Sequence, residues 1–150
     1  MGVTQAGSEG ADPRRRPEPA SAVVARNMSR QKVRDTSLEV ALRHALFALG
    51  LRYRVDSALP GMPRRRADIT FRAAKVAVFV DGCFWHGCPE HYIPPKHNAD
   101  WWHHKIHTNQ ERDADTDMRL RAEGWTPVRI WEHEPVERAV EEVLIHLPLR

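Results

Sequence analysis

The chain has 150 residues, of which 41% are hydrophobic, enough for one globular domain with a buried core. Its 23 Lys and Arg residues outnumber its 20 Asp and Glu residues, and the net charge of +3, carried mostly by arginine, suits a phosphate-bearing partner. No apolar stretch is long enough to span a membrane, the first residues lack the apolar core of a secretory signal, and two cysteines form no disulfide framework, so we expect a cytoplasmic protein.

The N-terminal third divides into an arm and the start of a folded domain. Residues 1–25 are rich in Gly, Pro, Ala, Arg and Glu and offer little to bury, which predicts a disordered arm before one domain over 26–150. A helix is predicted over 36–49, because Thr36 and Glu39 have the spacing of a capping box and apolar residues then recur at helical intervals.

Strands and helices follow, separated by Pro-rich loops. In chain order we predict strands over 51–56, 67–71 and 75–80, a helix over 98–123, a strand over 126–131 and a helix over 135–147, with loops over 59–63 and 93–95. Asn98 is the expected N-cap of the long helix, and Pro135 lies in the first turn of the last one. The order α, β, β, β, α, β, α predicts an α/β fold in which a small mixed sheet is flanked by helices.

Metal-ligand residue types are concentrated directly after the strand over 75–80. Cys83, His86, Cys88 and His91 lie within nine residues, and His133 just after the strand over 126–131 is the best distant fourth ligand. Two thiolates and two imidazoles make a tetrahedral zinc site, so we predict structural zinc. Either His86 or His91 can be the nearby imidazole ligand, and two buried thiols beside surface histidines remain the alternative.

Acid and base groups suited to phosphodiester chemistry lie on either side of this segment. Asp68, at the start of the strand over 67–71, can hold Mg²⁺, although capping a turn explains it equally well. His86, if it is not a zinc ligand, can take a proton from an attacking water or offset charge on the phosphate. The capping role of Glu39 explains that residue fully, so any role near a metal-bound water is additional.

The long helix carries one mixed face, and aromatic residues flank it. Seven residues recur at steps of three and four and share a face: Trp102, Lys105, Ile106, Asn109, Arg112, Asp113 and Thr116. An exposed, salt-bridged helix also explains this pattern. The pairs Phe84-Trp85 and Trp101-Trp102 can supply an apolar wedge for a DNA base stack, although core packing is the commoner fate of tryptophan.

Together these motifs resemble the very-short-patch (Vsr-type) repair endonucleases, bacterial enzymes that nick DNA at T:G mismatches. The resemblance covers roughly residues 26–143. It is carried by Arg26-Asn27-Met28, Thr36 to Glu39, Leu59-Pro60-Gly61, Arg66-Ala67-Asp68, Val78 to His86, Trp102 to Asn109, Glu111-Arg112-Asp113, Gly124-Trp125 and Trp131-Glu132. The Gly-Cys-Phe-Trp-His stretch at the end of a strand is the most specific of these.

The resemblance implies a restriction-endonuclease-like fold with a structural zinc and a catalytic Mg²⁺. It implies that Asp68 binds the Mg²⁺ together with the main-chain carbonyl of Val80. His86 and Asp113 would form the acid/base pair, and Glu39 would assist through a metal-bound water. The zinc ligands would be Cys83, Cys88, His91 and His133.

The same resemblance implies how DNA is held. The partner would be double-stranded DNA containing a T:G mismatch, bound by a monomer, with other repair proteins as further partners. Phe84, Trp85 and Trp102 would form the wedge beside the mismatch. The other implied contacts come from Lys105, Asn109, Arg112 and an arm around Met28 that reaches the opposite groove. Two alternatives remain: a non-catalytic zinc module that binds distorted DNA, and a related nuclease that cuts fully paired DNA.

Overall fold

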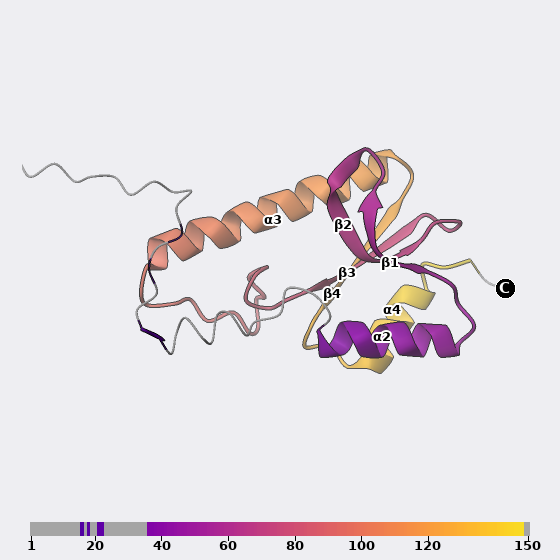
Figure 1. The fold of residues 1–150 in the computed structure, drawn as a ribbon, viewed down its shortest axis with the longest axis horizontal. Helices are drawn as coiled ribbons and strands as arrows, with labels where there is room; N and C mark the ends of the chain where they lie inside the picture. The colour runs from indigo at the N-terminus through magenta and orange to yellow at the C-terminus, as the bar shows by residue number, and fades with distance from the viewer. Residues whose placement is uncertain (1–15, 17, 19–20, 23–35, 149–150) are drawn as a thin grey trace, which may run out of the picture.

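The computed structural model describes residues 16, 18, 21–22 and 36–148. Met28, the proposed domain start at residue 26 and most of the predicted arm over 1–25 therefore lie outside the described residues. The described part contains four strands and three helices in the predicted order, an α/β arrangement (Figure 1). No helix in this part of the chain has the length and apolar character needed to cross a bilayer.

The strands form one mixed sheet, as predicted. Its strands are β1 (Arg54–Leu59), β2 (Met62–Phe71), β3 (Val76–Asp81) and β4 (Thr126–Trp131), and they lie in chain order across the sheet. β1, β2 and β3 pair antiparallel, whereas β3 and β4 pair parallel. The segments that follow β3 and β4 therefore leave the sheet at the same edge.

Helices cover both faces of the sheet. α2 (Ser37–Ala48) and α4 (Val136–Leu144) pack together beneath one face, and α3 (Ala99–Ala122) crosses the other and extends well beyond the sheet (Figure 1). Alternation along β3 decides which residues meet which helices, because neighbouring side chains on a strand point to opposite faces. The core under α2 and α4 contains Leu38, Leu42, Leu46, Ile69, Phe71, Val76, Val78, Val128, Ile130, Ala139 and Val143. The smaller core beneath α3 contains Leu59, Met62, Ala67, Ala77, Phe79 and Leu120.

The first strand was predicted three residues too early, and the loop predicted over 59–63 is a tight hairpin turn. Gly61, at a φ of +67°, takes the left-handed conformation that glycine adopts without strain, so the strands on both sides continue to the turn. Pro63 lies inside β2. It is tolerated there because β3 pairs only with residues 69–71 of β2, which leaves the other side of the hairpin unpaired.

This early divergence of β2 from β3 positions the candidate site. Asp68 was predicted at the start of a strand, but it lies inside β2, immediately before the first residue that pairs with β3. Its carboxylate accepts a hydrogen bond from the Val80 N–H, at 2.7 Å between oxygen and nitrogen, and so satisfies an amide of β3 that has lost its strand partner.

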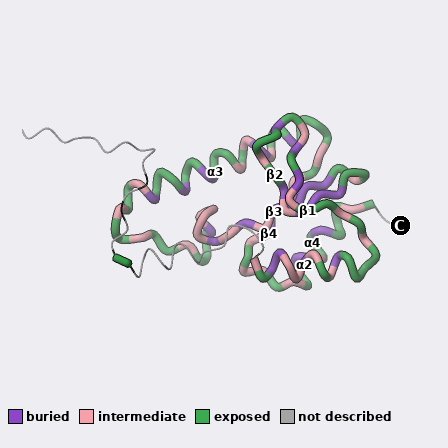
Figure 2. The backbone as a smooth tube through the Cα atoms, viewed as in Figure 1, coloured by how far each residue is buried: buried purple, intermediate pink, exposed green. Residues whose placement is uncertain are grey.

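The helix termini follow the predictions with small shifts. The Glu39 N–H donates to the Thr36 hydroxyl at 3.3 Å, so Thr36 caps α2 as predicted. Asn98 makes no side-chain cap to α3, and α4 ends at Leu144 rather than at residue 147. Along α3, exposed residues alternate with buried ones (Figure 2), as expected for a helix that packs along one side only.

Candidate active site

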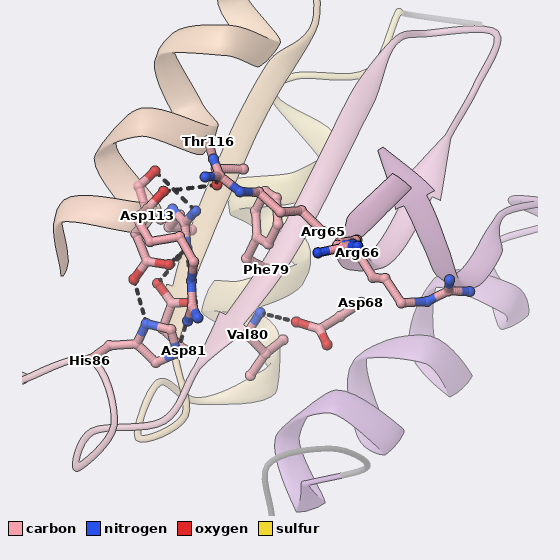
Figure 3. Close-up of a pocket in the computed structure, with 12 residues that line it drawn as sticks. Arg65, Arg66, Asp68, Phe79, Val80, Asp81, His86, Asp113 and Thr116 are labelled. Carbon is pink, nitrogen blue, oxygen red and sulfur yellow. Dashed lines mark hydrogen bonds and ion pairs between the residues drawn. The ribbon is translucent and has the colours of Figure 1, made fainter. Parts of the chain in front are cut away.

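A polar cavity of about 250 Å³ opens where β2 leaves β3, between the hairpin and α3 (Figure 3). The residues that line it come from β2, the end of β3, the segment after β3, α3 and β4. They are Arg64, Arg65, Arg66, Asp68, Phe79, Val80, Asp81, His86, Arg112, Asp113, Thr116 and Arg129. Three residues singled out by the sequence, Asp68, His86 and Asp113, thus line one cavity.

Asp68 lies in an environment that disfavours its charge. Burial raises the pKa of this carboxyl to about 7, and the negative charges of Glu39 and Asp81 add to the rise, although the hydrogen bond from Val80 opposes it. Glu39 is itself buried, at 2% exposure, and Arg43 pairs with it at 3.2 Å. A buried carboxylate whose pKa is raised by the charges of other carboxylates gains from a bound cation.

His86 lies between two carboxylates. Its Nδ1 is 2.5 Å from Asp113 Oδ2, and its Nε2 is 3.9 Å from Asp81 Oδ1. Burial alone would lower the pKa of the imidazole, but the hydrogen bond to Asp113 and the charges of Asp81 and Asp113 outweigh it, so the pKa is raised. The same contact lowers the pKa of Asp113 against the opposing effect of burial. A carboxylate on Nδ1 fixes the imidazole and leaves Nε2 as the nitrogen for proton transfer.

Arg129 links the carboxylates behind His86. It contacts Asp81 with Nη1 at 3.1 and 3.2 Å, contacts Asp117 with Nε and Nη2 at 2.8 to 3.0 Å, and stacks 4.2 Å above the Phe79 ring. Neither Arg129 nor Asp81 was among the site residues predicted from the sequence. The signal for Arg129 was present, since it stands between Val128 and Ile130, whose side chains enter the opposite core, and so had to face α3.

Arginines form the outer wall of the cavity. Arg64 and Arg66 on β2 and Arg112 on α3 are exposed, whereas Arg65 reaches across to α3 and contacts Asp115 at 2.6 Å. Arg65 therefore ties the hairpin to the helix over the cavity. Arg66 is paired with Asp56, at 3.0 Å from Nε to Oδ1, whereas the exposed guanidinium groups of Arg64 and Arg112 have the chemistry that binds phosphate.

A second cluster lies beyond the cavity, where the segments after β3 and β4 meet. Cys83, Cys88, His91 and His133 place their ligand atoms within 4.8 Å of one another. Cys83 Sγ is 3.2 Å from His133 Nδ1, and Cys88 Sγ is 3.7 Å from His133 Nδ1 and 3.8 Å from His91 Nδ1. Sulfur and nitrogen ligands around one tetrahedral zinc lie about 3.6 Å apart, so this donor set fits zinc.

The position of His86 separates the two histidine alternatives left open by the sequence. His86 groups with Asp81 and Asp113, whereas His91 groups with the two thiols. Burial and the neighbouring Cys88 raise the pKa of the Cys83 thiol, so two adjacent thiolates would be favoured here only with a bound cation.

The segment between the two clusters carries an aromatic group that packs on α3. The Phe84 ring lies 5.3 Å from Trp85, 5.2 Å from Trp102 and 6.0 Å from Tyr92, measured between centroids. Trp102 is buried at 4% exposure, whereas Phe84 and Trp85 are half-buried. Trp102 therefore supports the other two rings from below, and Phe84 and Trp85 are the ones that solvent or a ligand reaches.

Polar residues of α3 hold this segment in place. Asn109 is buried and donates to the Trp85 carbonyl at 2.9 Å, and Gln110 donates to the His86 carbonyl at 3.2 Å. Lys105 is exposed on the same helix. The Asn109 amide is thus occupied by a backbone hydrogen bond, whereas the side chains of Lys105 and Arg112 are exposed to a ligand.

The chain is similar in sequence to known DNA endonucleases. The family model for the DNA mismatch endonuclease Vsr matches residues 20–91. A type II nicking enzyme, V.NaeI of Lentzea aerocolonigenes, is 45% identical over 85% of this chain and 78% of its own length. The type II nicking enzyme V.NmeDIP of Neisseria meningitidis serogroup C is 42% identical over 73% of this chain and 74% of its own length. The DNA mismatch endonuclease Vsr of Escherichia coli K12 is 36% identical over 71% of this chain and 67% of its own length. The chain belongs to the Vsr family of DNA endonucleases.

Proposed function

We propose that this endonuclease nicks one DNA strand beside a T:G mismatch in a Mg²⁺-dependent reaction. The observation that carries the proposal is the convergence of Asp68, His86 and Asp113 on one polar cavity, with His86 hydrogen-bonded to Asp113. Hydrolysis of a phosphodiester needs a base for the attacking water, an offset for the growing negative charge and a held geometry. These three residues and the arginine wall offer each of them.

Asp68 and the main-chain carbonyl of Val80 would hold the catalytic Mg²⁺. Both line the cavity, and oxygen ligands are the ones Mg²⁺ prefers. The bound ion would offset negative charge on the scissile phosphate. Glu39 is buried and its charge raises the pKa of Asp68, and we propose that it assists through a metal-bound water.

His86 and Asp113 would supply the acid/base chemistry. Nδ1 is occupied by Asp113, so Nε2 takes the proton from the attacking water, and Asp113 steadies the imidazolium that results. The raised pKa of His86 lets it hold that proton near neutral pH. The arginine wall would seat the phosphates on both sides of the scissile bond.

The aromatic group would read the mismatch. Phe84 and Trp85 are the reachable rings, and they would enter the base step with Trp102 behind them. A T:G pair is held more weakly than a matched pair, so opening that step costs less. Lys105, Arg112 and a released Asn109 would contact the DNA along α3, and the segment around Met28 would reach the other groove.

Cys83, Cys88, His91 and His133 would bind a structural zinc that fixes this aromatic segment. Four protein ligands leave no open position, which is typical of structural rather than catalytic zinc. We expect the protein to cut DNA as a monomer. Other repair proteins are expected as further partners.

The test is a nicking assay on two duplexes that differ only at one pair, T:G or C:G, with each strand labelled separately. We expect Mg²⁺-dependent cutting of the T-containing strand of the T:G duplex, and no cutting in EDTA. Equal cutting of the C:G duplex would favour a nuclease for paired DNA, and mismatch binding without cutting would favour a non-catalytic DNA-binding module.

A further inference from the structure

Arg129 uses its whole guanidinium on protein groups around the cavity. One face stacks on Phe79, and the nitrogen edges point at Asp81, Asp117 and Asp113. Asp117 is held by two guanidinium nitrogens, Nε at 2.9 and 3.0 Å and Nη2 at 2.8 Å, whereas Nη1 alone reaches both oxygens of Asp81, at 3.1 and 3.2 Å. The forked contact to Asp117 fixes the direction of the guanidinium as well as its distance.

The two carboxylates nearest His86 are both held by this one side chain. Arg129 Nη1 lies 3.1 Å from Asp81 Oδ1 and 3.6 Å from Asp113 Oδ1, and Nη2 also donates to the Asp113 carbonyl at 3.4 Å. Asp81 approaches Nε2 of His86, and Asp113 bonds to Nδ1. Figure 3 shows both carboxylates beside the imidazole at the same wall of the pocket.

We propose that Arg129 is a positioning residue for strand cleavage, which holds Asp81 and Asp113 on two sides of His86 and thereby fixes the imidazole toward the scissile phosphate. The inference rests on the proposed acid/base role of His86 and Asp113. Arg129 itself acts through these residues, because its polar atoms are already engaged by the three aspartates.

The charge balance explains why this position needs a guanidinium. Asp81, Asp113 and Asp117 converge on one cation, and without it their mutual repulsion would push the Asp113 carboxylate off Nδ1. A lysine at 129 keeps the charge but offers one ammonium in place of the planar fork, so it cannot satisfy all three carboxylates in the same geometry. We therefore expect R129K to keep the fold and to lose the fixed orientation of the His86 imidazole.

The test compares R129K with wild type in the nicking assay, using whichever duplex the wild type cuts best. We expect kcat to fall about tenfold or more, since small misplacements of a reacting group are costly, while the KM for DNA stays within twofold. R119K is the matched control, because Arg119 pairs with Asp115 at 3.1 Å on the outer part of α3, and it should cut like wild type. In R129A, millimolar guanidinium should restore part of kcat, and methylammonium should restore less.

The proton NMR signal of the His86–Asp113 hydrogen bond tests the positioning role independently of protein stability and of substrate preference. The downfield proton of the His86–Asp113 hydrogen bond, assigned by its absence in H86A, should be lost or shifted in R129K without DNA present. Wild-type kcat in R129K, or an unchanged proton signal beside a reduced kcat, overturns the positioning role. Loss of mismatch preference in the wild type would count against the proposed function alone, whereas wild-type cutting by H86A would remove both.

Discussion

Asp68 and Val80 are joined across diverging strands by one hydrogen bond, from the Val80 N–H to the Asp68 carboxylate at 2.7 Å. The bond lies where β2 separates from β3, so the same irregularity that opens the cavity also fixes the carboxylate inside it. The bond uses one of the two oxygens of the Asp68 carboxylate, and Val80, whose carbonyl is the second proposed ligand, lines the same cavity. The proposed Mg²⁺ ligands are thus held by local backbone structure.

Replacement of Asp68 should separate cutting from binding. D68A removes the proposed Mg²⁺ ligand but none of the exposed arginines, so we expect nicking to fall about 100-fold or more while the Kd for the T:G duplex changes little. Single-turnover nicking and fluorescence anisotropy measure the two quantities. D100N, on the exposed first turn of α3, is the control for removing a negative charge near DNA. Normal cutting by D68A would show that the metal is held elsewhere.

Asp68 should also make the protein less stable as the pH rises. Its pKa is about 7 in the folded state against 3.8 for a free carboxyl, so folding disfavours the charged form, and stability falls between about pH 4 and pH 7. D68N keeps an oxygen acceptor for Val80 and cannot ionise. Without added Mg²⁺ we expect its Tm to exceed that of wild type at pH 8, by roughly 4 °C for each 1 kcal/mol recovered, and to match it at pH 4. Mg²⁺ should narrow the gap at pH 8, and a Tm difference that is the same at both pH values would contradict the assigned charge effect.

Phe84 should carry part of the mismatch preference. F84A removes a reachable ring, and because stacking of one base on an aromatic side chain contributes about 1–3 kcal/mol, the Kd for the T:G duplex should rise about tenfold. The Kd for the C:G duplex should change far less. F47A is the matched control, since Phe47 is 58% exposed on α2, away from the cavity. An equal loss on both duplexes would mean that the ring supports general DNA binding.

Sequence patterns predicted the elements well because local physics sets them. The capping of α2 by Thr36 and the apolar run of β3 are short-range features, and both appear as predicted, with β3 shifted by one residue from the predicted 75–80. The hairpin was misjudged because Pro60 and Pro63 are loop signals on average, whereas an unpaired strand side tolerates Pro63. That pairing is a property of the whole sheet, and residues 59–63 alone do not contain it.

The site was predicted residue by residue but not as a network. Asp68 and His86 were singled out by residue type and position, the role of Asp113 came from the family resemblance, and the fold brings all three to one cavity. Arg129 was missed because its importance arises from three aspartates on two other elements, which only the tertiary structure brings together. The choice between His86 and His91 as thiol neighbour likewise depends on the path of the chain after β3.

Asp113 should set the pH at which cutting begins. Burial lowers the pKa of His86, and the hydrogen bond to Asp113 together with the charges of Asp81 and Asp113 outweighs this, so D113N, which removes two of these contributions, should lower the pKa. A base with a lower pKa loses its proton at lower pH, and the rising limb of kcat against pH should therefore move in the acidic direction. The plateau should also fall about 100-fold, because the imidazole is less well held. Saturating Mg²⁺ keeps Asp68 from titrating in this range, and an unmoved limb would assign the titration to another group.

Zinc content should distinguish the two histidine positions. His133 lies 3.2 Å from Cys83 Sγ and 3.7 Å from Cys88 Sγ, whereas His86 bonds to Asp113 in the cavity. We therefore expect purified H133A to lose most of its zinc and to unfold at lower temperature, since four-ligand zinc contributes directly to folding.

H86A should keep one zinc per chain while failing to cut DNA, and H97A, at an exposed position in the following loop, should match wild type in both respects. Metal analysis by mass spectrometry with parallel melting curves gives both values. Zinc loss in H86A would make the catalytic imidazole a metal ligand and would require a different base for the attacking water.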